Sequence, residues 1–263
     1  MKERRAQFRF YEELNDFLPL KMRKKIFQYE FEGSPSIKDA IEAIGVPHTE
    51  VDLIIVNGRS VDFNYHLQNM DFVSVYPVFE SLDISPITHL RPEPLRRTRF
   101  ILDTQLGKLA RLLRMLGLDT LYKNDYDDNQ IIEISLSEKR IILTRDRGIL
   151  KNKKVTRGYW VRSTRAEEQI VEILNRFDLH TQIRPFTRCL KCNGIIKRVN
   201  KQDIICHIPK MTGNYYEQFY RCERCKKIYW KGPHYKRMNK KIEELMRKAD
   251  LSPNELHLSG NFL

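Results

Sequence analysis

Long apolar runs are missing from this sequence of 263 residues, and their absence excludes several classes of protein. No window approaches the roughly eighteen uncharged apolar residues that a membrane-spanning helix needs. The chain begins Met1-Lys-Glu-Arg-Arg5 and lacks the apolar segment that follows such charges in a signal peptide. We therefore expect neither a transmembrane helix nor a secreted protein, but a cytoplasmic one.

Cysteine is also scarce, because only five are present, and four of them form two Cys-x-x-Cys pairs. Such usage is typical of a reducing compartment and of a metal site rather than of disulfides. Two pairs offer four thiolates, which predict a tetrahedral Zn²⁺ site with no open position and hence a structural role. Its ligands would be Cys189, Cys192, Cys222 and Cys225, and the 29 residues between the pairs predict an inserted hairpin.

Two alternatives to this zinc site stay open at the level of sequence. The pairs could be redox-active or unpaired thiols rather than ligands. Cys206 or His207 could also replace one of the four cysteines, although we interpret these two as a buried thiol and a surface imidazole.

Acidic residues become scarce toward the C-terminus. Residues 1–85 contain 10 Lys and Arg against 14 Asp and Glu, and residues 91–183 contain 19 against 13. Residues 184–248 contain 18 against 5. This basic region favours a phosphate-rich partner such as RNA, and a merely solvated basic surface is the alternative.

Residues 99–148 alternate between short apolar stretches and amphipathic ones. The apolar stretches 99–103, 119–122 and 140–146 predict strands, and residues 106–116 and 131–136 predict helices, the first of which ends at Gly117. Apolar strands that are separated by helices indicate an α/β domain with a parallel sheet covered on both faces.

Aspartates stand at the ends of two of these strands and at the start of a helix. Asp103 and Asp146 follow strands, and Asp128 precedes a helix. Ligands of parallel sheets bind outside the carboxyl ends of the strands, so we expect the three carboxylates to meet there. Clustered carboxylates repel one another unless a cation neutralises them, and Mg²⁺ or Mn²⁺ suits such ligands. This predicts metal-assisted phosphodiester hydrolysis. The alternatives are that Asp128 is simply an N-cap and that each strand-end aspartate is a turn residue.

The same segments resemble the PIN-like RNase family called Mut-seven-C, over roughly residues 97–240. The resemblance is carried by Phe100-Ile-Leu-Asp103, by residues 106–117, by Asp127-Asp128 and by residues 140–147. It implies a PIN-type nuclease fold and metal-dependent RNA cleavage, with Asp103, Asp128 and Asp146 at the positions of three catalytic acids. The fourth acid of fuller PIN sites has no assigned equivalent here, and Asp125, Asp127 and Glu167 are candidates.

The first 85 residues predict a separate domain. Strands are expected at 6–11, 25–31, 51–58 and 71–77, and a helix with a Ser cap is expected at 36–44. This order resembles a ubiquitin-like β-grasp domain, including the module that accompanies the RNase family. A sulfur carrier would end in two glycines, whereas this chain continues through residues 78–82 without them. Binding of a protein partner or regulation is therefore the remaining role.

Cations and aromatic rings indicate where RNA could bind. Lys108 and Arg111 interrupt the first helix of the nuclease region, and Arg147 opens a basic segment that could equally be a solvated loop. After the second cysteine pair, rings alternate with cations, which suits base stacking and phosphate contacts. The residues proposed there are Trp230, Lys231, Lys236 and Arg237. The alternative is that these rings only pack the ribbon.

The whole chain thus predicts an α/β protein with several parts. The expected boundaries are 1–85 for the ubiquitin-like domain, 86–97 for a proline-rich linker, 98–183 for the nuclease domain, 184–238 for the zinc ribbon and 239–263 for a helix and tail. Our first hypothesis is a Mg²⁺- or Mn²⁺-dependent ribonuclease. The second is an RNA-binding or adaptor protein whose acidic site is vestigial.

Overall fold

The computed structural model describes residues 4–77 and 98–249. The chain divides into two compact units, which we call the N-terminal unit (Met1–Arg97 with Asp146–Trp160) and the C-terminal unit (Thr98–Arg145 with Val161–Leu263). The predicted linker at 86–97 and the end of the predicted tail lie outside the described residues. Within the described residues, every helix is too short or too polar to cross a bilayer.

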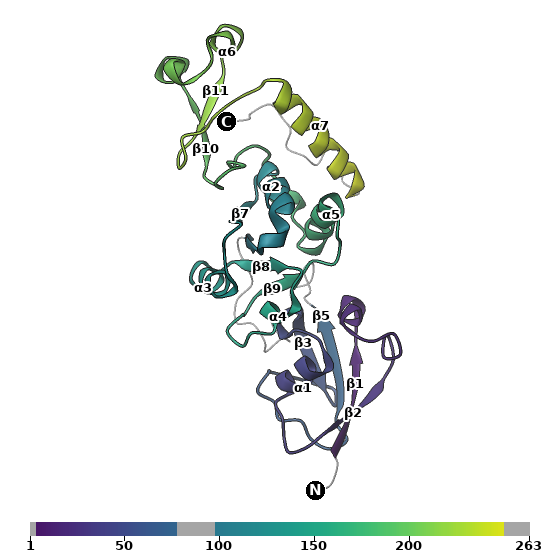
Figure 1. Cartoon of the computed structure of the whole chain (residues 1–263). Helices are drawn as coiled ribbons and strands as arrows, with labels where there is room; N and C mark the ends of the chain where they lie inside the picture. Colours follow the sequence, from purple (N-terminus) through teal and green to yellow (C-terminus); the bar gives the residue numbers. More distant parts are fainter. Residues whose placement is uncertain (1–3, 78–97, 250–263) are drawn as a thin grey trace. The chain divides into compact units, whose positions relative to one another are not determined.

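The N-terminal unit is built on a mixed five-stranded sheet in the order β2-β1-β5-β3-β4 (Figure 1). Its strands are β1 (Arg4–Phe10), β2 (Phe27–Phe31), β3 (Val51–Val56), β4 (Arg59–Val61) and β5 (Phe72–Pro77). The central pair β1 and β5 is parallel, and the other neighbours are antiparallel. This arrangement confirms the predicted β-grasp sheet and adds the short strand β4, which the sequence analysis did not predict.

Local signals in the sequence explain how this sheet is connected. Ser36 caps α1 (Ile37–Ile44), because its hydroxyl accepts the Asp39 backbone N–H at 3.1 Å, as predicted. Asn57 and Gly58 have φ values of 51° and 82°, which is the left-handed backbone that a tight hairpin between β3 and β4 requires. Alternate side chains of β1, Ala6, Phe8 and Phe10, are buried with α1 in one apolar core.

Residues 146–160 belong to the N-terminal unit, although they were predicted within the nuclease domain. They contain α4 (Arg147–Leu150) and β9 (Gly158–Trp160). The alternative of a solvated loop is therefore only partly correct, because part of the segment is helical and Ile149 and Leu150 are buried. The backbone carbonyl of Val155 lies 2.7 Å from Nε2 of the buried His48. The Trp160 N–H donates to the Glu50 carboxylate at 2.5 Å.

The C-terminal unit contains the predicted parallel sheet. The central strand β6 (Arg99–Leu102) pairs in parallel with β7 (Asp119–Leu121) and with β8 (Ile141–Thr144). The side chains of Phe100, Ile101 and Leu102 are all fully buried, as expected for a strand that is covered on both faces.

Helices connect and cover these strands. They are α2 (Gly107–Met115), α3 (Asp128–Glu138) and α5 (Ala166–Arg176). Gly117 follows the C-cap of α2 with φ 85°, and a Cβ atom there would lie 1.9 Å from the Arg184 carbonyl oxygen. Only glycine fits this position, because both the left-handed backbone and the close approach of residue 184 exclude a side chain.

The remainder of the C-terminal unit is a small antiparallel sheet and a long helix. Strands β10 (Ile196–Val199), β11 (Phe219–Cys222) and β12 (Ile228–Trp230) pair in chain order, and we call residues 187–232 the ribbon. The predicted hairpin is β10–β11, and its connection contains the short helix α6 (Lys210–Tyr215), which was not predicted. Helix α7 (Pro233–Lys248) begins earlier than the predicted residue 239 and packs on α5 (Figure 1).

Candidate active site and metal centre

Asp103 is the first residue after the central strand β6 and is only 8% exposed. Its backbone N–H donates to the Leu143 carbonyl at 3.1 Å, which continues the β6–β8 pairing. Its Oδ2 accepts the Thr144 hydroxyl at 2.8 Å, and its Oδ1 accepts the Thr104 hydroxyl at 3.1 Å. The carboxylate is therefore held by hydroxyls from two neighbouring segments at the carboxyl end of the parallel sheet.

Asp127 and Asp128 occupy different positions at the start of α3. Asp127 is the N-cap: its Oδ1 accepts the Gln130 N–H at 2.8 Å, and its own N–H donates to Gln130 Oε1 at 3.1 Å. Asp128 is the exposed first residue of the helix, so the alternative that it serves as the N-cap is wrong. Asp125 is also exposed.

Asp146 lies in the N-terminal unit and is exposed. Its Oδ1 accepts the Gly148 N–H at 2.7 Å, and the residue is the N-cap of α4. The alternative given for this strand-end aspartate was a turn residue, whereas the structure shows a helix cap.

Glu167, a candidate for the fourth acid, forms ion pairs instead. Its Oε1 accepts a hydrogen bond from Nζ of Lys241, and its Oε2 accepts one from Nζ of Lys248 at 3.1 Å. These two hydrogen bonds and the lysine charges lower the pKa of Glu167 to about 2. The residue therefore ties α5 to α7.

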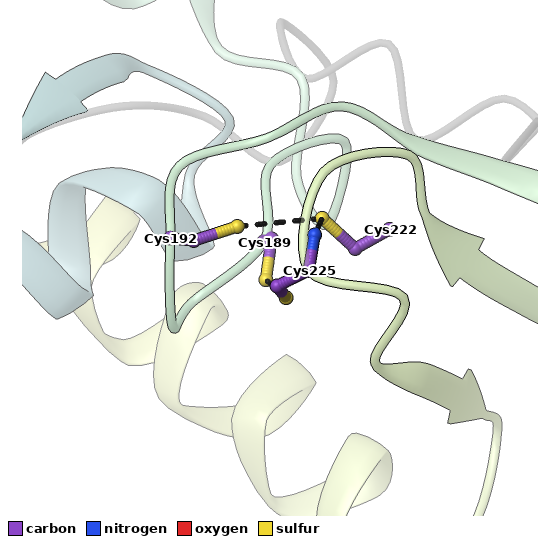
Figure 2. A group of neighbouring side chains, drawn as sticks. All are labelled: Cys189, Cys192, Cys222 and Cys225. Atoms are coloured by element: carbon purple, nitrogen blue, oxygen red, sulfur yellow. Dashed lines mark hydrogen bonds between the residues drawn. The ribbon is translucent and has the colours of Figure 1, made fainter.

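The four predicted cysteine ligands do come together (Figure 2). The Sγ atoms of Cys189 and Cys225 lie 3.5 Å apart, those of Cys192 and Cys222 lie 3.4 Å apart, and all four lie within 4.8 Å of one another. Thiolates around a tetrahedral Zn²⁺ at about 2.3 Å would be roughly 3.8 Å apart. Among the described residues, this is the sole group of three or more Cys, His, Asp or Glu gathered so closely, and it contains no carboxylate.

Cys206 and His207 are outside this group, as expected. Both are exposed, so the prediction of a surface imidazole is correct and that of a buried thiol is wrong. They follow the fully buried turn residue Ile204, which packs with Phe219 in a small core of the ribbon, and their own side chains project from the turn.

The cysteine cluster already favours one thiolate. Burial acts to raise the pKa of the Cys189 thiol, but hydrogen bonds from the Tyr229 hydroxyl at 3.0 Å and from backbone N–H groups lower it to about 6. Burial raises the pKa of Cys192 to about 12 and also raises that of Cys222. A metal ion that binds here would displace the remaining protons, because thiolates and not thiols are ligands.

A polar network that the sequence analysis missed fastens the ribbon to strand β7. Asp119 accepts hydrogen bonds from Arg140 at 2.8 Å, from Arg188 at 3.1 Å and from Asn193 at 2.8 Å. The buried Arg114 of α2 donates to the carbonyls of Leu190 and Lys191, next to the first cysteine pair, and also to Thr120 and Tyr122. The only sequence signal was an arginine, Arg114, among the apolar residues of a helix face.

The predicted RNA-binding residues of the C-terminal unit occupy different environments. Lys108 and Arg111 are exposed on α2, and Lys236 and Arg237 are exposed on the first turns of α7. The half-buried Trp230 packs against the small core of the ribbon, and Lys231 lies 6.0 Å from the Tyr235 ring. The alternative that these rings pack the ribbon is thus correct for Trp230. It is also correct for Tyr229, which lies against the cysteines.

Arg147 of the N-terminal unit is also placed against rings. Its guanidinium lies 3.9 Å from the centre of the Trp160 ring and 5.1 Å from that of Phe17. It therefore takes part in cation–π contacts within its own unit, which the basic character of residues 147–154 did not reveal.

Comparison with known proteins agrees with these features. A family model described as the Mut7-C RNAse domain matches residues 98–242, and one described as Mut7-C ubiquitin matches residues 3–83. A human protein named "Exonuclease mut-7 homolog" is 34% identical over 106 residues, which are 38% of this chain and 12% of that relative. The chain therefore spans a small part of that relative. No solved structure matches the chain.

The two matched regions correspond to features that are already visible in the structure. The ubiquitin model coincides with the β-grasp sheet, and the RNase model covers the parallel sheet, the ribbon and the first part of α7. Because the RNase model matches more than half of the sequence, this chain belongs to the Mut7-C RNAse domain family and carries a Mut7-C ubiquitin domain before its RNase domain.

Proposed function

We propose that this protein is a metal-dependent ribonuclease that hydrolyses RNA phosphodiester bonds at a PIN-like aspartate site. The observation that carries the proposal is Asp103, a buried carboxylate fixed by two hydroxyls at the carboxyl end of the central parallel strand. Membership in a nuclease family supports the reaction class. Asp128 and Asp146 are proposed to complete the acidic site.

The donor set suits Mg²⁺ or Mn²⁺. Each oxygen of Asp103 accepts one hydroxyl hydrogen bond, and a carboxylate offers about four lone-pair sites, so acceptor capacity remains for a cation. Hard divalent ions prefer such oxygen ligands and retain water molecules. When bound, the ion would polarise the phosphate and lower the pKa of a water molecule.

The protein's own residues would position the substrate and the carboxylates. Thr144 and Thr104 keep the Asp103 carboxylate in one orientation, and the exposed Lys108 and Arg111 of α2 are proposed to contact RNA phosphates. The four cysteines are proposed to hold a structural Zn²⁺, since four protein ligands leave no position for a substrate. The ubiquitin-like domain is proposed to bind a protein partner, and the site of action to be the cytoplasm.

A cleavage assay tests the catalytic proposal. Single-stranded and structured RNA would be incubated with the protein after EDTA treatment and after Mg²⁺ or Mn²⁺ is restored, with zinc content measured in each sample. We expect cleavage only with the restored ion, and we expect Asp103→Asn to lose at least about a hundredfold in rate. Asp203→Asn, an exposed acid of the ribbon, is the control. Unchanged cleavage by the Asp103→Asn protein would remove the mechanism.

A second candidate is an RNA-binding adaptor without catalytic activity. The observation that favours it is the use of nearby acids for other purposes, because Asp127 caps α3 and Glu167 pairs with two lysines. This candidate predicts RNA binding that weakens with salt and no turnover with any divalent ion. Turnover that depends on Asp103 would exclude it.

A further inference from the structure

We infer that a cleft between the first cysteine pair and the end of β7 is the path along which single-stranded RNA reaches the carboxyl edge of the parallel sheet. This inference rests on the proposed function and adds a substrate-binding site to it. The cleft has a volume of about 580 Å³ and lies within the C-terminal unit. We call it the knuckle cleft.

The two walls of the knuckle cleft come from different parts of the unit. One wall is formed by the end of β7, by Tyr122, Lys123 and Tyr126, and by helix α3. The other wall is formed by residues 191–195 and by Arg224 and Cys225 of the second cysteine pair. The network around Asp119 and Arg114 joins these walls below, so the cleft has a rigid floor.

Positive charge dominates the lining of the cleft. Six Lys or Arg side chains line it against two carboxylates, those of Asp119 and Glu138. A four-thiolate zinc site nearby would add two negative charges, which still leaves the lining positive. The three inner arginines donate to Asp119, Glu138 or backbone carbonyls. The three outer cations are therefore the ones that remain to contact a ligand in the cleft.

These outer cations are Lys123, Lys191 and Arg224. All three are exposed, and within the described residues none of them forms an ion pair with a carboxylate. They belong to three separate segments that face one cleft, so a chain of phosphates that follows the cleft could contact each in turn. A polyanion with charges spaced along a flexible backbone is the ligand that fits this arrangement.

Two tyrosines of the cleft indicate a nucleic acid with unpaired bases. Tyr122 and Tyr126 line the same wall as Lys123, and Lys123 Nζ lies 5.3 Å from the centre of the Tyr126 ring. Proteins that bind single strands combine such rings, on which bases stack, with a basic groove that follows the backbone. An acidic peptide would use the cations but would gain nothing specific from the rings.

One wall of the cleft is joined to the residue next to Asp103. Strands β6 and β7 pair in parallel with Ile101 opposite Leu121, so the residues that follow them, Asp103 and Lys123, emerge at the same edge. The Tyr122 hydroxyl donates to the Thr104 carbonyl at 3.0 Å, which fixes the cleft wall to the residue next to Asp103. RNA in the knuckle cleft would therefore present a phosphodiester beside the proposed catalytic edge.

The test measures RNA binding without any added divalent ion, so that affinity is separated from cleavage. A labelled, unstructured RNA would be titrated with the wild-type protein and with a Lys123→Ala, Lys191→Ala, Arg224→Ala variant, over a range of salt concentrations. Each phosphate contact contributes about 0.7 to the salt slope for single strands, so we expect a loss of about two units. At 0.1 M salt this corresponds to roughly a hundredfold weaker binding.

A charge-matched control is the Lys21→Ala, Lys25→Ala, Arg59→Ala variant, which removes three exposed cations from the N-terminal unit. We expect it to bind RNA within about twofold of wild type. Tyr126→Ala should weaken binding about fivefold or more, whereas Tyr126→Phe should retain it, because a base can stack on either aromatic ring. Circular dichroism and zinc content would show that each variant is folded.

Two results of the binding experiment would overturn the inference. One is that the cleft variant binds like the charge-matched control, and the other is that a fully paired duplex binds as tightly as the single strand and equally needs the three cations. Failure of the proposed function looks different: RNA binding would depend on the cleft, but no divalent ion would produce cleavage. If the cleft variant cleaves RNA with an unchanged KM, the proposed RNA path is wrong, but the proposed ribonuclease function is not contradicted.

Discussion

The buried Thr144 hydroxyl helps to fix the orientation of the Asp103 carboxylate. Thr144 is fully buried as the last residue of β8, and its hydroxyl donates to Asp103 Oδ2 at 2.8 Å. A hydroxyl that holds one carboxylate oxygen leaves the other lone pairs of the carboxylate aimed in a fixed direction. Thr144 would thus act as a positioning residue in the proposed ribonuclease.

We expect Thr144→Val to reduce kcat by about 10–100-fold, the range seen when the partner of a metal ligand is removed, with little change in KM. Valine keeps the shape of threonine, so the free energy of unfolding should fall by only about 1–2 kcal/mol. Thr144→Ser should restore activity, because it keeps the hydroxyl. Steady-state cleavage kinetics and urea unfolding would measure both effects. Equal activity of the valine and serine variants would show that the hydrogen bond has no positioning role.

For single residues, the sequence predicted which side chains form the sites better than it predicted the contacts that those side chains make. The four cysteines were predicted by spacing alone, because two Cys-x-x-Cys pairs allow few other roles. Asp127 rather than Asp128 caps α3, and the signal was present in Gln130, three residues later, which completes a capping box. The cation–π contact of Arg147 with Trp160 could not be predicted from the sequence, since it depends on tertiary packing.

At the scale of elements, strand β7 and the ribbon are held together by Asp119. Burial acts to raise the pKa of this carboxyl, but hydrogen bonds from Arg140 and Asn193 and the charges of Arg140 and Arg188 lower it below its usual value. Removal of the charge would leave two arginines without their common partner in a partly buried place.

We expect Asp119→Asn to lower the free energy of unfolding of the C-terminal unit by roughly 3 kcal/mol, as for other broken buried ion pairs. The matched control is Glu138→Gln, which removes the other partner of Arg140 from a position with 45% side-chain exposure and should cost under about 1 kcal/mol. Urea unfolding at pH 7 compares the two. Equal decreases would mean that Asp119 does not fasten the ribbon.

Helix α7 depends on an ion pair that pH can remove. The pKa of Glu167 is lowered to about 2 in the folded protein by Lys241 and Lys248, against an ordinary value of 4.5. Because the folded value is the lower one, the stabilisation is present above pH 4.5 and is lost as the pH falls toward 2.

The expected result is that Glu167→Gln lowers the Tm at pH 6–7 and increases amide hydrogen exchange in α7. The difference in Tm between wild type and variant should narrow below about pH 4.5, and high salt should also reduce it. Glu168→Gln, whose side chain is 53% exposed and lies beside Arg165, is the control and should change neither quantity. A pH-independent difference would contradict the ion-pair explanation.

Most helices and strands were predictable because their apolar periodicity is strong. Helices α1 and α2, strand β6, which ends just before Asp103, and strand β8, which ends at Thr144, follow from that pattern. The short helices α4 and α6 were missed, since each spans less than two turns and lacks a repeating apolar face. Helix α7 begins at Pro233, a residue that reads as a helix breaker but is tolerated in the first turn.

At the scale of the whole molecule, charge is divided unequally between the parts. Residues 184–248 carry 18 Lys and Arg against 5 acids, whereas residues 1–85 carry 10 against 14. Any affinity for RNA should therefore come mainly from the C-terminal unit and should fall steeply with salt.

A Lys231→Ala, Lys236→Ala, Arg237→Ala variant tests how far this affinity extends beyond the knuckle cleft. We expect a higher Kd and a salt slope reduced by about 0.7 for each phosphate that the variant no longer binds, with zinc content and the saturating cleavage rate nearly unchanged. Fluorescence anisotropy at several salt concentrations gives both quantities. If binding survives intact, the affinity lies elsewhere on the unit, along the cleft or α2.

The order of the parts was predictable, whereas the division of the chain between them was not. The β-grasp pattern, the parallel-sheet pattern and the cysteine pairs follow one another in the sequence. Residues 146–160, however, group with the N-terminal unit. Their apolar residues, such as Ile149 and Leu150, are buried, but an apolar side chain does not indicate in the sequence which elements will cover it.

This division has a consequence for how the protein is made. A ribosome releases the chain from its N-terminus, so the first 97 residues emerge well before the segment that completes their unit. At about 5–20 residues per second, synthesis of the next 63 residues, up to Trp160, takes several seconds. During that interval His48 lacks the Val155 carbonyl and Glu50 lacks the Trp160 N–H. These two hydrogen bonds of the N-terminal unit can therefore form only after strands β6, β7 and β8 have been synthesised.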